Sequence, residues 1–271
     1  WNGLMITALA AAGRIFEEPR YIESALKAQK FISQNMMSAN SRLLHRYRDG
    51  DAAIRGFAGD YAFYIWGLVE LFQTTQKSGF LEQALLLNDA FIADFWDEMD
   101  GGFFTTSDDG EALLIRDKEI YDGAIPSANS VALYNLIRLA RITGRVDLEE
   151  KSDLVGAAFS LTVNRSPSAY TFLMSALSFA AGPAYEIVIV GDPADDSTTA
   201  MMKALTERYL PNSVLIVRKV GDSEGIDKLS SFVRGYDSMD GKATAYVCQN
   251  YSCQLPTNDV SELLIMLGKG E

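Results

Sequence analysis

The strongest constraint on the fold is a set of helical segments that repeat in pairs. Apolar residues recur at helical spacing, and the segments that begin at Asn2, Asp60 and Asn129 resemble one another. Segment 80–85 likewise repeats the pattern of segment 21–26 after about 60 residues. The repeat predicts three helical hairpins, because each pair of segments has the periodicity of two packed helices.

Two long connections separate the predicted hairpins. Residues 39–58 and 99–127 exceed the usual loop length, whereas the links inside each hairpin are short. Antiparallel helices place both long connections at the same end of the helical layer, and long loops often carry function. We expect a β-hairpin in each: one from 42–48, the turn Asp49-Gly50 and 51–55, the other from 102–106 and 111–116.

The helical pattern changes near Pro183. After it come three apolar runs that predict strands and two segments that predict helices, the last with a capping box: strands 185–191, 214–218 and 243–249, and helices at 197–210 and after Asp259 with Glu262. Residues 1–183 are thus predicted to form a helical-hairpin domain that is incomplete at its N-terminus, because the chain opens at Trp1 inside a helix. Residues 184–271 are predicted to form a small α/β unit, so the fold class is mainly α.

Charge and composition exclude several function classes. The chain carries 36 acidic and 24 basic side chains, a net charge of −12, which opposes binding to nucleic acid and to anionic membranes. The longest uncharged stretch, 166–185, contains Pro167 and Pro183 and predicts a short buried helix instead of a membrane span. The loop after Gly191 lacks a glycine-rich phosphate fingerprint, so no nucleotide cofactor is expected.

The two cysteines are too few for a disulfide-stapled fold. With a single histidine in the chain, Cys248 and Cys253 cannot complete a four-ligand zinc site, so no metal is expected. We expect reduced structural thiols and a cytoplasmic location. A disulfide that closes a hairpin is the alternative, if the two α-carbons approach within about 7 Å.

Five motifs, in order along the chain, are similar to a known family. They are Trp1-Asn-Gly-Leu-Met5, Gly56-Phe-Ala-Gly-Asp-Tyr61, Asp100-Gly-Gly-Phe-Phe104, Asp122-Gly-Ala-Ile-Pro-Ser-Ala-Asn129 and Cys248-Gln-Asn-Tyr-Ser-Cys-Gln-Leu-Pro256. The chain resembles the C-terminal part of the YyaL-type family of thioredoxin-domain-containing proteins, related to the mammalian spermatogenesis-associated proteins. The resemblance implies a partial (α/α) six-hairpin toroid, as in glycosidases and sugar epimerases. It also implies an upstream thioredoxin-like domain as a partner in the parent protein.

Acidic residues concentrate in the second long loop. Between Asp94 and Gly123, ten acidic side chains less two basic ones leave −8 of the total −12. Paired carboxylates about 5 to 10 Å apart can act as acid and base or nucleophile in glycoside chemistry. The candidate catalytic residues are Asp97 and Asp122 from this loop and Asp60 from the first. The alternative is that these acids are solvated or ion-paired, in particular with the arginines of the first loop.

Six further residues are candidates for substrate binding. His45 could carry a proton near neutral pH, and Ser127 could cap a helix or touch a ligand. At equivalent places in the repeat, Asn2 and Asn129 could hydrogen-bond sugar hydroxyls, although their oxygens, like those of Asp60, also suit helix N-caps. Tyr61 and Tyr121 could stack on a sugar ring, although such aromatics usually belong to the core.

These observations support two hypotheses. In the first, the chain binds or converts a neutral sugar or polyol by carboxylate acid/base chemistry, as a glycosidase-like or sugar epimerase/isomerase-like domain. In the second, it is a non-catalytic scaffold or client-binding region for the thioredoxin-like domain.

Overall fold

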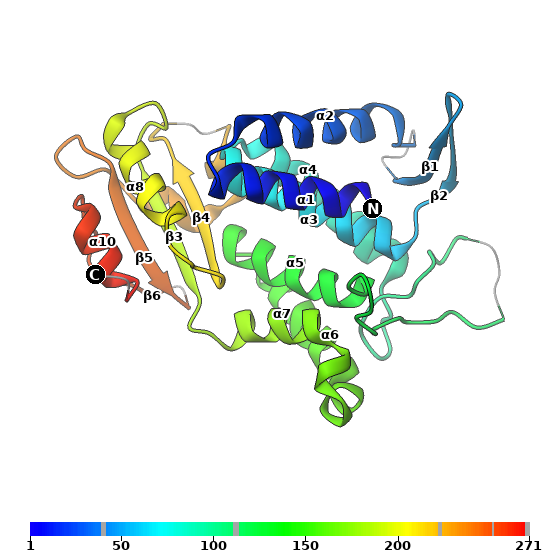
Figure 1. The fold of residues 1–271 in the computed structure, drawn as a ribbon. Helices are drawn as coiled ribbons and strands as arrows, with labels where there is room; N and C mark the ends of the chain where they lie inside the picture. The colour runs from blue at the N-terminus through cyan, green and yellow to red at the C-terminus, as the bar shows by residue number, and fades with distance from the viewer. Residues whose placement is uncertain (39–41, 111–113, 222–223, 251, 269–271) are drawn as a thin grey trace.

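The first part of the chain folds into helical hairpins, as predicted (Figure 1). The computed structural model describes residues 1–38, 42–110, 114–221, 224–250 and 252–268. Helix α1 packs on α2, α3 on α4, and α5 on both α6 and α7. These helices are α1 (Asn2–Ile15), α2 (Pro19–Asn35), α3 (Ala58–Thr75), α4 (Ser78–Phe95), α5 (Ala128–Thr143), α6 (Val146–Arg165) and α7 (Thr171–Ala181).

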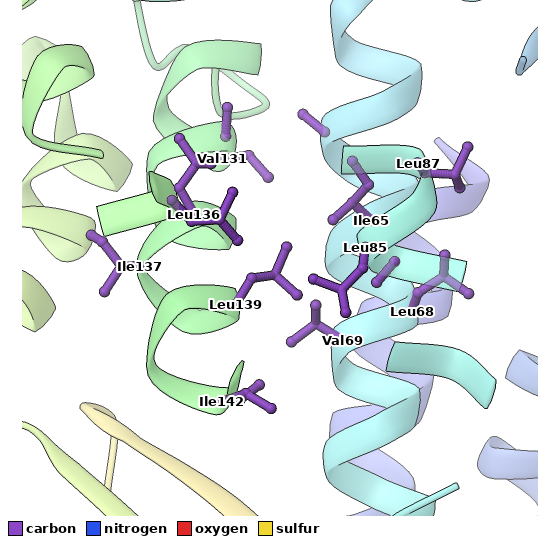
Figure 2. Close-up of a cluster of buried hydrophobic side chains, with 14 of the residues drawn as sticks. Ile65, Leu68, Val69, Leu85, Leu87, Val131, Leu136, Ile137, Leu139 and Ile142 are labelled. Atoms are coloured by element: carbon purple, nitrogen blue, oxygen red, sulfur yellow. The ribbon is translucent and has the colours of Figure 1, made fainter. Parts of the chain in front are cut away.

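Helix α3 lies at the centre of the helical part. It contacts α1 on one side and α5 on the other, so the first helices of the three hairpins form one row. Figure 2 shows Val69 of α3 and Leu139 of α5 pointing toward each other, and both are fully buried. Burial of such a side chain contributes about 1.5–3 kcal/mol. Because α3 is apolar around most of its circumference, it is stable only inside this row.

Helices α1 and α3 approach each other through glycine. A Cβ atom at Gly3 would lie 2.6 Å from the carbonyl carbon of Phe63, and one at Gly67 would lie 3.2 Å from the carbonyl oxygen of Gly3. Any larger residue at Gly3 would therefore push the two backbones apart.

The first long connection forms the predicted β-hairpin. Strand β1 (Leu44–Arg48) pairs antiparallel with β2 (Asp51–Arg55). The turn residues Asp49 and Gly50 both have positive φ, at 52° and 84°, as a two-residue hairpin turn requires. Figure 1 shows this hairpin at the same end of the helices as the second long connection, as predicted.

The second predicted β-hairpin is wrong. Residues 102–106 form no strand, and residues 111–113 lie outside the described residues. Gly101 and Gly102 both have positive φ, which bends the backbone out of an extended path. The backbone of Phe103 then bonds to the side chain of Asn129 and not to a full strand partner.

Ion pairs join the two long connections, as the opposite charges of the loops predict. Arg42 bonds to Asp94, with 2.7 Å between Nη2 and Oδ1, and it also pairs with Asp109. Arg55 pairs with Asp109 as well. The hydrogen bond from Arg42 lowers the pKa of Asp109. Burial raises the pKa of Asp94, against the opposing charge of Arg42.

A mixed sheet follows the helices. Strands lie in the order β4-β3-β5-β6; β3 and β4 are parallel, joined through α8, and the other pairs are antiparallel. Val188 and Ile216 face the helical core, whereas Ile187 and Val247 face α8 and α10. The elements are β3 (Tyr185–Val190), α8 (Asp196–Thr206), β4 (Ser213–Arg218), α9 (Ile226–Leu229), β5 (Thr244–Gln249), β6 (Ser252–Cys253) and α10 (Val260–Met266).

The mainly α class, with hairpins before a small α/β unit, is thereby confirmed. The uncharged stretch 166–185 contains α7, with Leu173 and Phe179 buried, as expected for a core helix. Among the described residues, no helix combines the length and apolarity needed to span a membrane. The last helix before the sheet ends at Ala181 and β3 begins at Tyr185; the domain boundary at 183/184 stays a prediction.

Polar side chains fix the sheet to the helices. Gln73 of α3 bonds to both backbone groups of Leu215 in β4: its Oε1 accepts from N at 2.9 Å and its Nε2 donates to O at 3.0 Å. Arg141 of α5 pairs with the fully buried Glu186 of β3. This ion pair holds the sheet in place against α5, because separating the two side chains would leave a buried charge without a partner.

The expectation of free thiols is wrong, because Cys248 and Cys253 form a disulfide. They lie directly opposite each other in the antiparallel β5–β6 pair. The short strand β6 was not predicted from the sequence, and its pairing with β5 is what brings the two sulfurs together. The cysteines therefore no longer support the prediction of a reducing compartment.

Candidate functional site

A cavity of about 370 Å3 opens at the N-terminal ends of α3 and α5. The two helix starts form one wall and the end of the second long loop forms the other. Most of the lining residues are aromatic or small. The complete lining is Phe57, Ala58, Gly59, Phe63, Phe103, Thr105, Glu119, Tyr121, Gly123, Ala124, Ile125, Pro126, Ala128 and Asn129. An apolar cavity of this size with few polar groups is typical of a small-molecule site.

Asn129 ties the loop to α5 at the wall of this cavity. Its Oδ1 accepts from the backbone N of Phe103 at 2.7 Å, and its Nδ2 donates to the carbonyl oxygens of Phe103 and Glu119 at 2.9 and 2.8 Å. The side chain is almost fully buried. Asn129 lines the predicted site, but its amide is occupied in shaping the wall and not free for a ligand.

Glu119 and Tyr121 line the cavity, are exposed and have polar side-chain groups. Exposure alternates along this segment: Glu119 and Tyr121 are exposed, and Lys118 and Ile120 are partly buried. Tyr121 was a candidate from the sequence, whereas Glu119 was not singled out. Glu119 lies two positions before Tyr121 in the acid-rich loop, and in an extended segment such residues share one side. This spacing could have identified Glu119 from the sequence.

His45 and Asp60 form a pair beside the cavity. Nδ1 of His45 lies 2.8 Å from Oδ2 of Asp60, and the imidazole packs edge-on against the ring of Phe57, which lines the cavity. Asp60 also accepts from the backbone N of Phe57 at 2.8 Å. The carboxylate thus fixes both the start of α3 and the orientation of the imidazole.

Asp97 lies away from the cavity lining and stabilises a turn. Its Oδ1 accepts from the backbone N of Met99 at 3.0 Å and of Asp100 at 3.2 Å, and its Oδ2 bonds to Nζ of Lys118 at 2.6 Å. The hydrogen bond from Lys118 is the main reason that the pKa of Asp97 is lowered. These contacts keep Asp97 ionised and occupied.

Asp122 connects the starts of two helices. Its Oδ1 accepts from the backbone N of Ser127 at 2.8 Å, and its Oδ2 accepts from the N of Phe172 and Leu173 at 2.8 and 3.0 Å. A carboxylate at the start of α7 is favoured by the helix dipole. Asp60, Asp97 and Asp122 therefore do not converge, and none of the three is among the described residues that line the cavity.

The remaining predicted binding residues are dispersed. Ser127 caps α5 by accepting from the N of Ser130 at 3.1 Å. Tyr61 is buried in the core, where its hydroxyl accepts from the N of Leu43 at 3.1 Å, and burial raises its pKa. Asn2 is exposed as the first residue of α1.

The predicted N-caps at Asn2, Asp60 and Asn129 are wrong. The caps are Trp1, Phe57 and Ser127, so each predicted residue lies one to three positions inside its helix. The repeat predicts the first residue of each helix only to within about one turn, and an error of this size is enough to place a side chain inside the helix instead of at its cap.

In the described ranges, no cluster of three or more His, Cys, Asp or Glu side chains is suited to hold a metal ion.

Comparison with known proteins gives relatives over nearly the whole chain, although no protein-family model matches it. Human spermatogenesis-associated protein 20 is 35% identical over 277 residues, which are 98% of this chain and 35% of that protein. An uncharacterized protein of Caenorhabditis elegans is 29% identical over 280 residues, 99% of this chain and 37% of that protein. The chain thus spans about a third of the length of these relatives.

Among solved structures, the cellobiose 2-epimerase of Bacillus thermoamylovorans aligns with a TM-score of 0.48 at 17% identity, over 57% of this chain and 42% of that chain. The sequence relatives are the stronger evidence for the family of this chain, because they match it over 98–99% of its length. Over almost its whole length, the chain is a homologue of part of spermatogenesis-associated protein 20, the relationship that its sequence motifs predict.

Proposed function

We propose that the cavity at the starts of α3 and α5 binds a neutral sugar or polyol. The observation that carries the proposal is the lining: the aromatic residues Phe57, Phe103 and Tyr121 and the acidic residue Glu119 border a cavity of about 370 Å3. Aromatic faces stack on sugar rings, and a carboxylate accepts hydrogen bonds from hydroxyls. A net charge of −12 disfavours phosphorylated sugars.

Two groups in or beside the lining are of a kind that moves protons. One is the carboxylate of the lining residue Glu119. The other is the imidazole of His45, which Asp60 orients and which packs against the lining residue Phe57. A carboxylate and an imidazole are suited to acid/base chemistry at a sugar carbon or a glycosidic oxygen. Glu119 therefore replaces Asp97 and Asp122 as the preferred catalytic carboxylate, and Asp60 becomes a positioning residue for His45.

The test is binding of neutral ligands to the purified chain. Glucose, mannose, cellobiose and myo-inositol are titrated by calorimetry, with glucose 6-phosphate as the charged comparison. We expect saturable binding of at least one neutral ligand, weakened about tenfold in Glu119→Gln, because a hydrogen bond to a charged group is lost. Glu98→Gln is the matched control, since Glu98 is also an exposed acid of the acid-rich stretch between Asp94 and Gly123 and does not line the cavity.

Absence of binding by all four neutral ligands, or equal binding by wild type and Glu119→Gln, would contradict this proposal. A turnover assay on the ligand that binds then separates binding from chemistry. His45→Gln should abolish turnover with an unchanged Kd if the imidazole moves a proton.

The alternative is a non-catalytic scaffold or client-binding region beside an upstream thioredoxin-like domain. The observation in its favour is that the carboxylate oxygens of Asp97 and Asp122 accept hydrogen bonds from backbone groups at a turn and at helix starts. Co-purification of the parent protein's thioredoxin-like domain with this chain would support it, and the same four ligands would then leave the chain unaffected. A cytoplasmic location also stays a prediction, to be tested by cell fractionation.

A further inference from the structure

A second cavity, of about 250 Å3, lies between the helices and the sheet. One side is formed by the C-terminal parts of α1 and α3 and the middle of α5, and the other by β3, β4, the end of α8 and the segment that follows it. Its charged and polar lining consists of Arg14, Glu70, Gln73, Tyr134, Arg138, Thr206, Arg208, Tyr209 and Ser213. No residue is shared with the cavity proposed to bind a neutral sugar, which lies at the opposite ends of α3 and α5.

The charge of this lining is opposite to that of the protein. Three arginines face one carboxylate, so the lining carries a net charge of about +2 in a chain whose net charge is −12. Arg138 is almost fully buried, Arg14 is partly buried and Arg208 is exposed. Burying a guanidinium group such as that of Arg138 costs free energy unless an anion compensates its charge.

Glu70 compensates only part of this charge. One of its oxygens, Oε1, lies 2.6 Å from Nη1 of Arg138, and the other, Oε2, lies 3.4 Å from Nη2 of Arg14. Burial alone would raise the pKa of Glu70, but the two arginines lower it, so the carboxylate is ionised. A single negative charge is thus shared between two guanidinium groups.

Donor capacity is left over after this pairing. The buried Nε of Arg138 has no hydrogen-bond acceptor among the described residues. Arg208 lies two residues after the end of α8 and is exposed, and among the described residues its side chain has no ion-pair or hydrogen-bond partner. The hydroxyls of Thr206 and Ser213 donate to the carbonyl oxygens of Met202 and Leu210. The hydroxyl of Tyr209 is a further donor in the lining.

We propose that this second cavity binds a small anion through a phosphate or carboxylate group, held by Arg14, Arg138 and Arg208. Arginine is suited to both groups because its planar donors match two oxygens at once. The volume lies below the range of about 300–1,000 Å3 that holds drug-sized ligands, so the ligand is a small metabolite or the inorganic ion. Such an anion would connect α1 and α5 to the segment after α8. This proposal is independent of the sugar-binding function proposed above.

The test is calorimetric titration of the whole chain with inorganic phosphate and, separately, with malonate, at constant ionic strength set with chloride. We expect saturable binding of at least one of them at one site. Arg208→Gln should weaken that binding about tenfold, since one charge-assisted contact is lost. Arg14→Gln should weaken it similarly, and thermal unfolding without ligand identifies any variant that fails to fold.

Arg48→Gln is the matched control, because Arg48 is an exposed arginine in the β-hairpin at the opposite end of the helices. Phosphate binding alone identifies a phosphoryl ligand, malonate binding alone a carboxylate ligand, and binding of both a general oxyanion site. Binding of neither ion, or a loss in Arg48→Gln equal to that in Arg208→Gln, overturns the proposal.

Discussion

Asn129 holds the backbone of Phe103 through both atoms of its amide, with 2.7 Å from N of Phe103 to Oδ1 and 2.9 Å from Nδ2 to O of Phe103. A side chain here replaces the strand partner that a β-hairpin would have provided. The second long loop is therefore anchored to α5 at the cavity wall, although it has no regular structure of its own in the described residues.

Asn129→Asp should destabilise the fold by about 3 kcal/mol. The new carboxylate oxygen would face the carbonyl oxygens of Phe103 and Glu119. Only its other oxygen would keep a donor, the backbone N of Phe103, so the buried charge would be poorly compensated. Urea unfolding at pH 7 measures the change. Asn2→Asp is the matched control from the equivalent helix start: Asn2 is exposed, and its variant should unfold within about 0.5 kcal/mol of wild type. Equal losses in both variants would refute the anchoring role.

The helical pairs were predictable because their evidence is local. Periodicity within α3 and α5 and the Asp49-Gly50 turn each depend on residues close in sequence. Contacts such as Gln73 with Leu215 join residues 142 positions apart, and nothing in either segment marks the partner. The pairing of Cys248 with Cys253 failed for a related reason, since it required the unpredicted strand β6.

The region of the candidate site was predictable, but its members were not. Acid density correctly drew attention to the second loop, which forms one wall of the cavity. Nothing in the sequence distinguishes Asp97, Glu119 and Asp122, which are all acids of the same acid-rich stretch. They differ in their partners: Lys118 holds Asp97, backbone amides hold Asp122, and Glu119 alone of the three lines the cavity.

The pairing of Asp97 with Lys118 should make stability depend on pH. Because the folded state lowers the pKa of Asp97, its contribution is complete above the unfolded value of about 3.9 and is lost as the pH falls through the lower folded value. Asp97→Asn should therefore cost roughly 1–3 kcal/mol at pH 7 and much less at pH 2. Urea unfolding at both pH values tests this, with the exposed Asp100→Asn as control. A loss that is equal at the two pH values would show that the charge of Asp97 is not responsible.

Reduction of the Cys248–Cys253 disulfide should expose two thiols and weaken the fold. The cysteines are separated by 5 positions, so the closed loop is small and its stabilisation is on the order of 2 kcal/mol. Alkylation of the unfolded chain followed by mass spectrometry should label no cysteine before treatment with a dithiol reductant and both after it. The double variant Cys248→Ser, Cys253→Ser should match the reduced wild type in urea unfolding. Two labelled cysteines before reduction would restore the free-thiol prediction.

Gly3→Ala should destabilise the packing of α1 against α3. The added Cβ would lie 2.6 Å from the carbonyl carbon of Phe63 and 2.7 Å from the N of Tyr64, and these backbone atoms cannot move aside without shifting α3. Overpacking of this kind costs about 1–3 kcal/mol, which urea unfolding measures. Gly79→Ala in α4 is the control, because nothing lies within 4 Å of its Cβ position, and there alanine should stabilise the helix by up to about 1 kcal/mol. If both variants gained stability, the close approach of α1 and α3 would be disproved, and with it the row of first helices that brings the starts of α3 and α5 to one cavity.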